Sequence, residues 1–159
     1  MNKIKILLYG DILILDSESN LLIKVKRIFK WNSKIALNFY KNDILLLKTS
    51  HYSLLPFILE KIEYQNLTRN INFQKIEGKE TLVVDGTKIK INHKLGYLIN
   101  KYLCDVLIDD RVIANVKIES RLSLEGIVLD VFFKEEVDYQ IRELCLINLA
   151  IKYSDIDGD

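Results

Sequence analysis

Up to about residue 134, the chain consists of short apolar runs separated by polar turns. The runs are rich in Ile, Val, Leu, Tyr and Phe, and in several of them apolar and polar residues alternate, as when Ile23 and Val25 flank Lys24. Period-two alternation indicates a strand with one buried face and one wet face. The pattern predicts twelve strands at residues 3–9, 11–16, 21–29, 34–40, 43–49, 57–64, 70–77, 80–85, 87–93, 97–108, 111–119 and 127–134.

Residues with turn-forming chemistry separate these runs. The side chains from Ser17 to Asn20 can hydrogen-bond their own backbone, and Asp85-Gly86 fits a two-residue hairpin because glycine accepts a positive φ. Asp109-Asp110 has the same character. Many short strands joined in this way favour a sandwich or a closed barrel.

The pattern changes in the last part of the chain, from Glu135 to Tyr153. This stretch has no Gly or Pro, and its acidic residues come first while Lys152 comes last, which complements a helix dipole. From Leu144 to Ile151 only Asn148 is polar. A helix that is apolar nearly all round must be surrounded by protein or lipid. We therefore predict a mainly β fold, a closed antiparallel barrel of about twelve strands around a buried C-terminal hydrophobic helix.

Length and composition predict one domain. The 159 residues include a single proline, Pro56, and no Pro/Gly/Ser-rich linker. The predicted barrel domain covers residues 1–155, and residues 156–159 form an acidic tail. Asp155, Asp157 and Asp159 resemble the first ligands of a calcium loop, but such a loop needs about twelve residues and a closing glutamate. A frayed acidic terminus is expected instead.

Charge and cysteine content narrow the class of partner and the compartment. The 23 basic and 22 acidic residues give a net charge of +1, so nucleic acid is not expected and any basic site must be local. Cys104 and Cys145 lie in apolar stretches without metal-ligand spacing, which predicts buried reduced thiols and a cytoplasmic protein. Asp11 interrupts the N-terminal apolar run, which favours a strand over a signal peptide. No run has the roughly 20 apolar residues of a transmembrane segment.

The order of these segments resembles a known family. The hairpins "ILDSESNLLIKVKRIF" and "VLIDDRVIANVKIESRL", the segment "TSHYSLLPFILEKI" and the final "NLAIKYSD" are similar to the tubby C-terminal-like superfamily, specifically its small LURP-one-related members. Phospholipid scramblases look like relatives of that fold. The resemblance covers roughly Asp11 to Asp155 and implies a twelve-stranded barrel around a central hydrophobic helix. It also implies a role among membrane phosphoinositide binding, lipid scrambling and functions not yet assigned.

Signals of catalysis or metal binding are sparse. The chain has no GxSxG, P-loop or Rossmann glycine pattern. Its two histidines, His51 and His93, have no His, Cys or acidic partner at ligand spacing. We therefore predict no catalytic residue, no metal ligand and no cofactor.

Two groups of basic residues are the candidate binding residues. One group surrounds the hairpin near Trp31, where Phe29 and Tyr52 would add interfacial aromatic rings, and the other follows a later strand. Lysines on alternating strands often only keep the outer face soluble. If both groups meet on one side of the barrel, they would bind phosphate head groups at about 1 kcal/mol per lysine. The candidate lipid- or phosphate-binding residues are Lys24, Lys26, Arg27, Lys30, Trp31, Lys34, Lys88, Lys90 and Lys94.

These observations predict a non-enzymatic binding module that acts at an anionic phospholipid surface or on a protein partner. Two other functions stay open. An assembly domain would dimerise through exposed strand surface. An enzyme would need convergent polar groups around His51 or His93.

Overall fold

Twelve strands and one helix make up the described part of the chain. The computed structural model describes residues 2–29, 34–52, 59–64, 71–76, 79–84, 86–94, 101–123, 126–134 and 136–154. The strands are β1 (Asn2–Tyr9), β2 (Asp11–Leu15), β3 (Leu21–Phe29), β4 (Lys34–Lys41), β5 (Ile44–Tyr52), β6 (Leu59–Tyr64), β7 (Ile71–Ile76), β8 (Lys79–Val84), β9 (Thr87–His93), β10 (Tyr102–Ile108), β11 (Arg111–Ser123) and β12 (Gly126–Phe133). Helix α2 (Tyr139–Lys152) follows the last strand.

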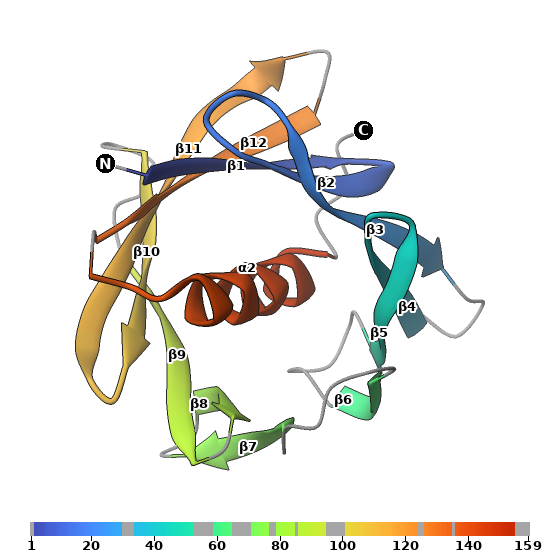
Figure 1. Cartoon of the computed structure of the whole chain (residues 1–159), viewed down its shortest axis with the longest axis vertical. Helices are drawn as coiled ribbons and strands as arrows, with labels where there is room; N and C mark the ends of the chain where they lie inside the picture. The colour runs from blue at the N-terminus through green and yellow to red at the C-terminus, as the bar shows by residue number, and fades with distance from the viewer. Residues whose placement is uncertain are drawn as a thin grey trace.

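All twelve strands belong to one antiparallel sheet. Its order is β6-β5-β4-β3-β2-β1-β12-β11-β10-β9-β8-β7. The first strand therefore lies between the second and the last, and Ile6 pairs with Ile14 on one side and with Leu129 on the other. This pairing joins the two halves of the chain in the middle of the sheet. The sheet then curves around α2, which lies in the centre (Figure 1).

Alternating burial along the strands explains why the sheet encloses the helix. On β2 and β4 every second side chain is buried, as with Ile12, Ile14 and Phe39, and these side chains form one core with the helix. On α2 every residue from Leu144 to Ile151 is buried, including Asn148. The predicted mainly β fold with a buried C-terminal hydrophobic helix is confirmed.

The helix begins later than the sequence pattern predicts. It starts at Tyr139 instead of Glu135, because Asp138 has an extended backbone with ψ 147° and serves as the N-cap residue. Arg142 N–H donates to the carbonyl of Asp138 at 3.0 Å, which closes the first helical turn. Glu136 and Asp138 therefore precede the first turn, while Lys152 does lie in the last turn, as predicted.

Closure of the barrel is not confirmed. Strands β6 and β7 are the two ends of the hydrogen-bonded order, and no pairing joins them among the described residues. All twelve predicted strands are present, and several, such as β3 and β9, have the predicted bounds. The predicted acidic tail lies outside the described residues. Within the described part, no helix is long and apolar enough to span a bilayer.

The central position of α2 can be tested with a buried charge. Leu149 is fully buried, so Leu149→Asp would place a carboxylate in the apolar core at a cost of several kcal/mol, against a typical total stability of about 5–15 kcal/mol. We expect this variant to be unfolded by circular dichroism. Ile44→Asp makes the same apolar-to-acidic change at a residue that is 60% exposed and should keep the urea midpoint of the wild type. A cooperatively folded Leu149→Asp protein of normal stability would contradict the buried helix.

Candidate functional site

The basic residues of β3 point to two different sides of the sheet. Lys24 and Lys26 face outward, and the Nζ of Lys24 lies 3.6 Å from the carboxylate of Asp11. The ammonium of Lys26, which is exposed, lies 5.5 Å from the ring centre of Tyr40 on the neighbouring strand. Arg27 has the opposite orientation, toward the inside of the sheet. The alternation along β3 thus separates Arg27 from the two lysines.

Arg27 anchors the C-terminal end of α2. Its Nη1 donates to the carbonyl of Ser154 at 3.0 Å, and its Nε donates to the carbonyl of Gly10 in the turn between β1 and β2. Ser154 is the second residue after α2 and is buried, so its carbonyl gains a charged donor where water has little access. Arg27 therefore connects the helix to the sheet.

The basic residues of β9 are largely engaged with carboxylates. The Nζ of Lys90 lies 3.0 Å from Asp110, and the Nζ of Lys94 lies 3.0 Å from Asp105. Lys88 is exposed. These pairs keep the outer face of β9 close to neutral.

The two predicted basic groups do not meet. Five strands separate β3 from β9 in the sheet, which is six strand spacings of about 4.8 Å, or about 29 Å along the sheet. The two strands lie on opposite sides of α2 (Figure 1). Lys34 begins β4, next to β3, whereas Lys30 and Trp31 lie outside the described residues.

Large apolar side chains are exposed where β3 ends. Tyr9, Ile28 and Phe29 are 58%, 45% and 53% exposed. Arg27 donates a hydrogen bond to the carbonyl of Gly10. Ile28 follows Arg27 and Tyr9 precedes Gly10, so Tyr9 and Ile28 lie at the same end of the sheet. We call Tyr9, Lys26, Ile28 and Phe29 the β3-end surface. Lys26 and Ile28 lie on the outward side of β3, whereas the ring of Phe29 lies 5.7 Å from the guanidinium of Arg27, at the end of the inner side.

A second group of lysines lies on adjacent strands in the middle of the sheet. Lys3 and Lys5 on β1 approach Asp130 and Glu119 at 2.8 Å and 3.0 Å. The ammonium groups of Lys3 and Lys117 lie 5.8 Å and 5.6 Å from the ring centre of Phe132. The hydrogen bond with Lys5 lowers the pKa of Glu119. Sequence reasoning missed this group because pairing of the first strand with the last has no local signal.

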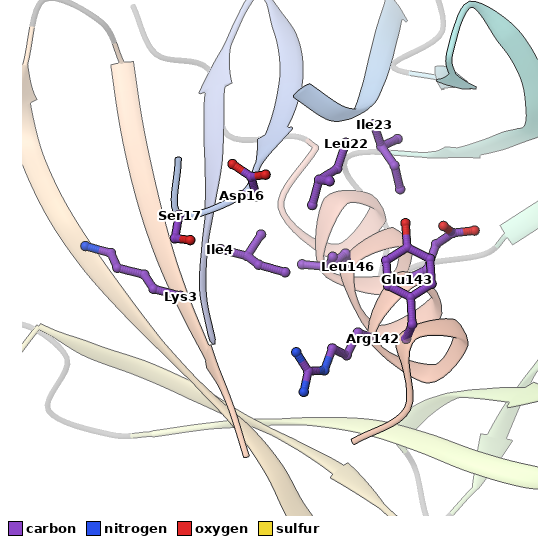
Figure 2. A pocket seen from close by; sticks show the side chains of 10 residues that line it. Lys3, Ile4, Asp16, Ser17, Leu22, Ile23, Arg142, Glu143 and Leu146 are labelled. Atoms are coloured by element: carbon purple, nitrogen blue, oxygen red, sulfur yellow. The ribbon is translucent and has the colours of Figure 1, made fainter. Parts of the chain in front are cut away.

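A cavity of about 270 Å³ lies between the sheet and the first half of α2 (Figure 2). It is at the opposite end of β1 from the β3-end surface, since β1 runs from Lys3 at the cavity to Tyr9, about 20 Å away at 3.4 Å per residue. The lining residues are Lys3, Ile4, Asp16, Ser17, Leu22, Ile23, Tyr139, Arg142, Glu143 and Leu146. The strand pattern alone gives no sign of it, because its walls come from three separate segments.

Tyr153, just after α2, contacts His93 and Cys104. The hydroxyl of Tyr153 lies 3.3 Å from Nδ1 of His93 and donates to the sulfur of Cys104 at 3.4 Å. Burial raises the pKa of Cys104 to about 11 and that of Cys145 to about 12, so both thiols stay protonated at neutral pH. Both are buried and free, as predicted. The side chain of His51 lies outside the description, and the described residues contain no cluster that could hold a metal ion.

Lys94 belongs to a hydrogen-bonded network around a buried carboxylate. Asp105 is 5% exposed and accepts hydrogen bonds from Tyr102 and from Asn115 Nδ2, the latter at 2.7 Å, in addition to its ion pair with Lys94. Burial alone would raise the pKa of Asp105, but these donors outweigh burial and hold the pKa below its usual value. Lys94 therefore has a role in the fold.

Comparison with protein-family models, curated proteins and solved structures found no match to this chain. The resemblance to the tubby C-terminal-like superfamily stays a prediction.

The role of Arg27 leads to a stability prediction. Arg27→Met removes the donors to two backbone carbonyls, and hydrogen bonds from charged groups contribute about 1.5–3 kcal/mol each. We expect the free energy of unfolding in urea to fall by about 2 kcal/mol or more. Lys26→Met at the neighbouring exposed position should change it by less than about 0.5 kcal/mol. Equal stability of the two variants would argue against the anchoring role.

The Asp105 network leads to a prediction about pH. A carboxyl whose folded-state pKa is depressed stabilises the fold above its unfolded pKa of about 3.9, and this stabilisation is lost as the pH falls through the folded-state pKa. Asp105→Asn should therefore be less stable than the wild type at pH 7 by about 1–3 kcal/mol, and the difference should shrink at pH 3. Urea midpoints at pH 7, 5 and 3 measure it, with the exposed Asp43→Asn as control. A difference that is independent of pH would contradict the assignment.

Proposed function

We propose that the protein is a non-enzymatic module that associates peripherally with anionic membrane surfaces through the β3-end surface. The observation that carries this proposal is the exposure of Tyr9, Ile28 and Phe29 at the end of the sheet where Lys26 is also exposed. Peripheral binding combines apolar side chains that enter the head-group region with cations attracted to anionic lipid. Tyrosine is also a residue type that favours the membrane–water interface.

Two contributions of comparable size support the proposal. A large apolar side chain that is fully removed from water contributes about 1.5–3 kcal/mol, and a lysine near an anionic surface contributes about 1 kcal/mol. Lys26 is exposed on β3. Lys24 lies on the same strand and Lys34 on the neighbouring β4, and the carboxylate of Asp11 partly offsets the charge of Lys24. Neither contribution alone holds a protein at a membrane. Binding should therefore require both and should weaken at high salt.

The resemblance to the tubby C-terminal-like superfamily gives independent support, because that superfamily includes phosphoinositide-binding proteins. We propose that this chain is a LURP-one-related member and that its sheet closes into a barrel between β6 and β7. Both strands lie on the same side of α2 in Figure 1, and they are the two ends of the curved sheet. We also propose a cytoplasmic location, which is supported by two buried free cysteines that suit a reducing compartment.

Vesicle co-sedimentation tests the proposed function. The purified protein is mixed with neutral or anionic phospholipid vesicles at low and high salt. We expect binding to the anionic vesicles, with a marked loss at high salt because ionic screening weakens the lysine contribution. Absence of binding under all conditions would refute the membrane proposal.

Paired variants locate the binding surface. Lys26→Glu and Phe29→Ser should each weaken binding to anionic vesicles by about fivefold or more, since each removes about 1 kcal/mol or more of attraction. Lys88→Glu makes the same charge change on the far side of the sheet, and Ile44→Ser makes a similar apolar-to-polar change at an exposed residue of the opposite end. These two controls should bind like the wild type. Equal losses in all four variants would place the binding elsewhere.

A further inference from the structure

The cavity beside α2 has aliphatic walls. Ile4 on β1, Leu22 and Ile23 on β3 and Leu146 on α2 line it, and the side chains of Ile4 and Leu146 point toward each other across it (Figure 2). Its volume of about 270 Å³ lies just below the range of about 300–1,000 Å³ for small-molecule sites, so it suits a ligand smaller than a drug. An aliphatic ligand would regain the dispersion contacts that these walls lack.

Two of the four charged groups at the rim of the cavity have ion-pair partners. The Nζ of Lys3 lies 2.8 Å from the carboxylate of Asp130. The carboxylate of Glu143 accepts a hydrogen bond from Lys41, whose ammonium also lies 4.9 Å from the ring centre of Tyr139. A charged ligand would compete with these pairs.

The other two charged groups are satisfied by backbone or by a local turn. The carboxylate of Asp16 accepts from the N–H of Glu18 at 2.9 Å, from the N–H of Asn20 at 2.8 Å and from Nδ2 of Asn20 at 2.9 Å. Arg142 donates from Nε to the carbonyl of Val137 at 2.8 Å. All four rim charges therefore have partners within the chain. A charged ligand would lose hydration here, and the two basic and two acidic residues of the lining offer no net charge of either sign to offset that loss.

We propose that this cavity binds a small uncharged amphiphile. An aliphatic chain would lie against Ile4, Leu22, Ile23 and Leu146, and a neutral polar end such as a hydroxyl would face Ser17, which is exposed at the rim. The apolar walls disfavour a charged head group, and the balanced charges of the lining residues favour neither sign. The site lies at the opposite end of β1 from the β3-end surface, so a ligand can enter it from solution whether or not that surface is occupied.

Three probes with the same alkyl chain test the charge preference. Binding of 1-octanol, octanoate and octylammonium is followed by NMR of the isoleucine and leucine methyl groups in the full chain. We expect 1-octanol to give saturable shifts at Ile4, Leu22, Ile23 and Leu146, at lower concentration than either charged probe. Absence of saturable shifts at these methyl groups, or tighter binding of a charged probe, would overturn the proposal.

A matched pair of variants tests the location. Leu22→Trp should fill the cavity and weaken octanol binding by about tenfold or more, because a closely packed space excludes further atoms. Leu21→Trp adds the same ring at the neighbouring residue, which is 52% exposed and does not line the cavity, and it should bind octanol like the wild type. If Leu22→Trp does not fold, Ser17→Trp and Glu18→Trp form a second pair in an exposed turn, and only Ser17 lines the cavity. Equal binding by both members of a folded pair would overturn the proposal.

Discussion

The burial of a helix that is apolar on nearly every side is the constraint on which the rest of the structure depends. Every residue from Leu144 to Ile151 is buried. A flat sheet covers only one side of a helix, so hiding this one requires a sheet that curves around it. Pairing of β1 with β12 makes such a sheet possible, because it joins the two halves of the chain into one surface. The alternation of buried side chains along each strand then supplies a continuous apolar lining.

The same inside–outside division assigns different roles to cations that are neighbours in sequence. Arg27 falls on the inner face and holds the end of the helix, whereas Lys26 falls on the outer face and is exposed. Elsewhere on the outer face, lysines lie beside carboxylates of neighbouring strands, as Lys5 does beside Glu119. The near-zero net charge of the chain thus corresponds to local pairing on the outer face, whereas Lys26 lies against the ring of Tyr40.

The strands could be predicted from sequence because burial alternates with period two, a local property. Bounds such as Leu21–Phe29 follow directly from it. The start of α2 could not be predicted from the sequence. Glu135, Glu136 and Asp138 resemble an acidic first turn, but the backbone at Asp138 is extended and the helix begins after it. The candidate sites were harder still. The outward direction of Lys24 and Lys26 is local, but the distance between β3 and β9 depends on strand order, and the ion pair of Lys5 with Glu119 joins residues 114 positions apart.

The position of the helix after all twelve strands has a consequence for synthesis. During translation β1 emerges long before β12, the strand with which it pairs, and α2 emerges later still. The apolar inner faces of the early strands therefore stay exposed to water until α2 is available to cover them. The many pairings between strands far apart in sequence also make folding slow. Nascent chains of this protein are expected to be prone to aggregation and to depend on chaperones until the helix has left the ribosome.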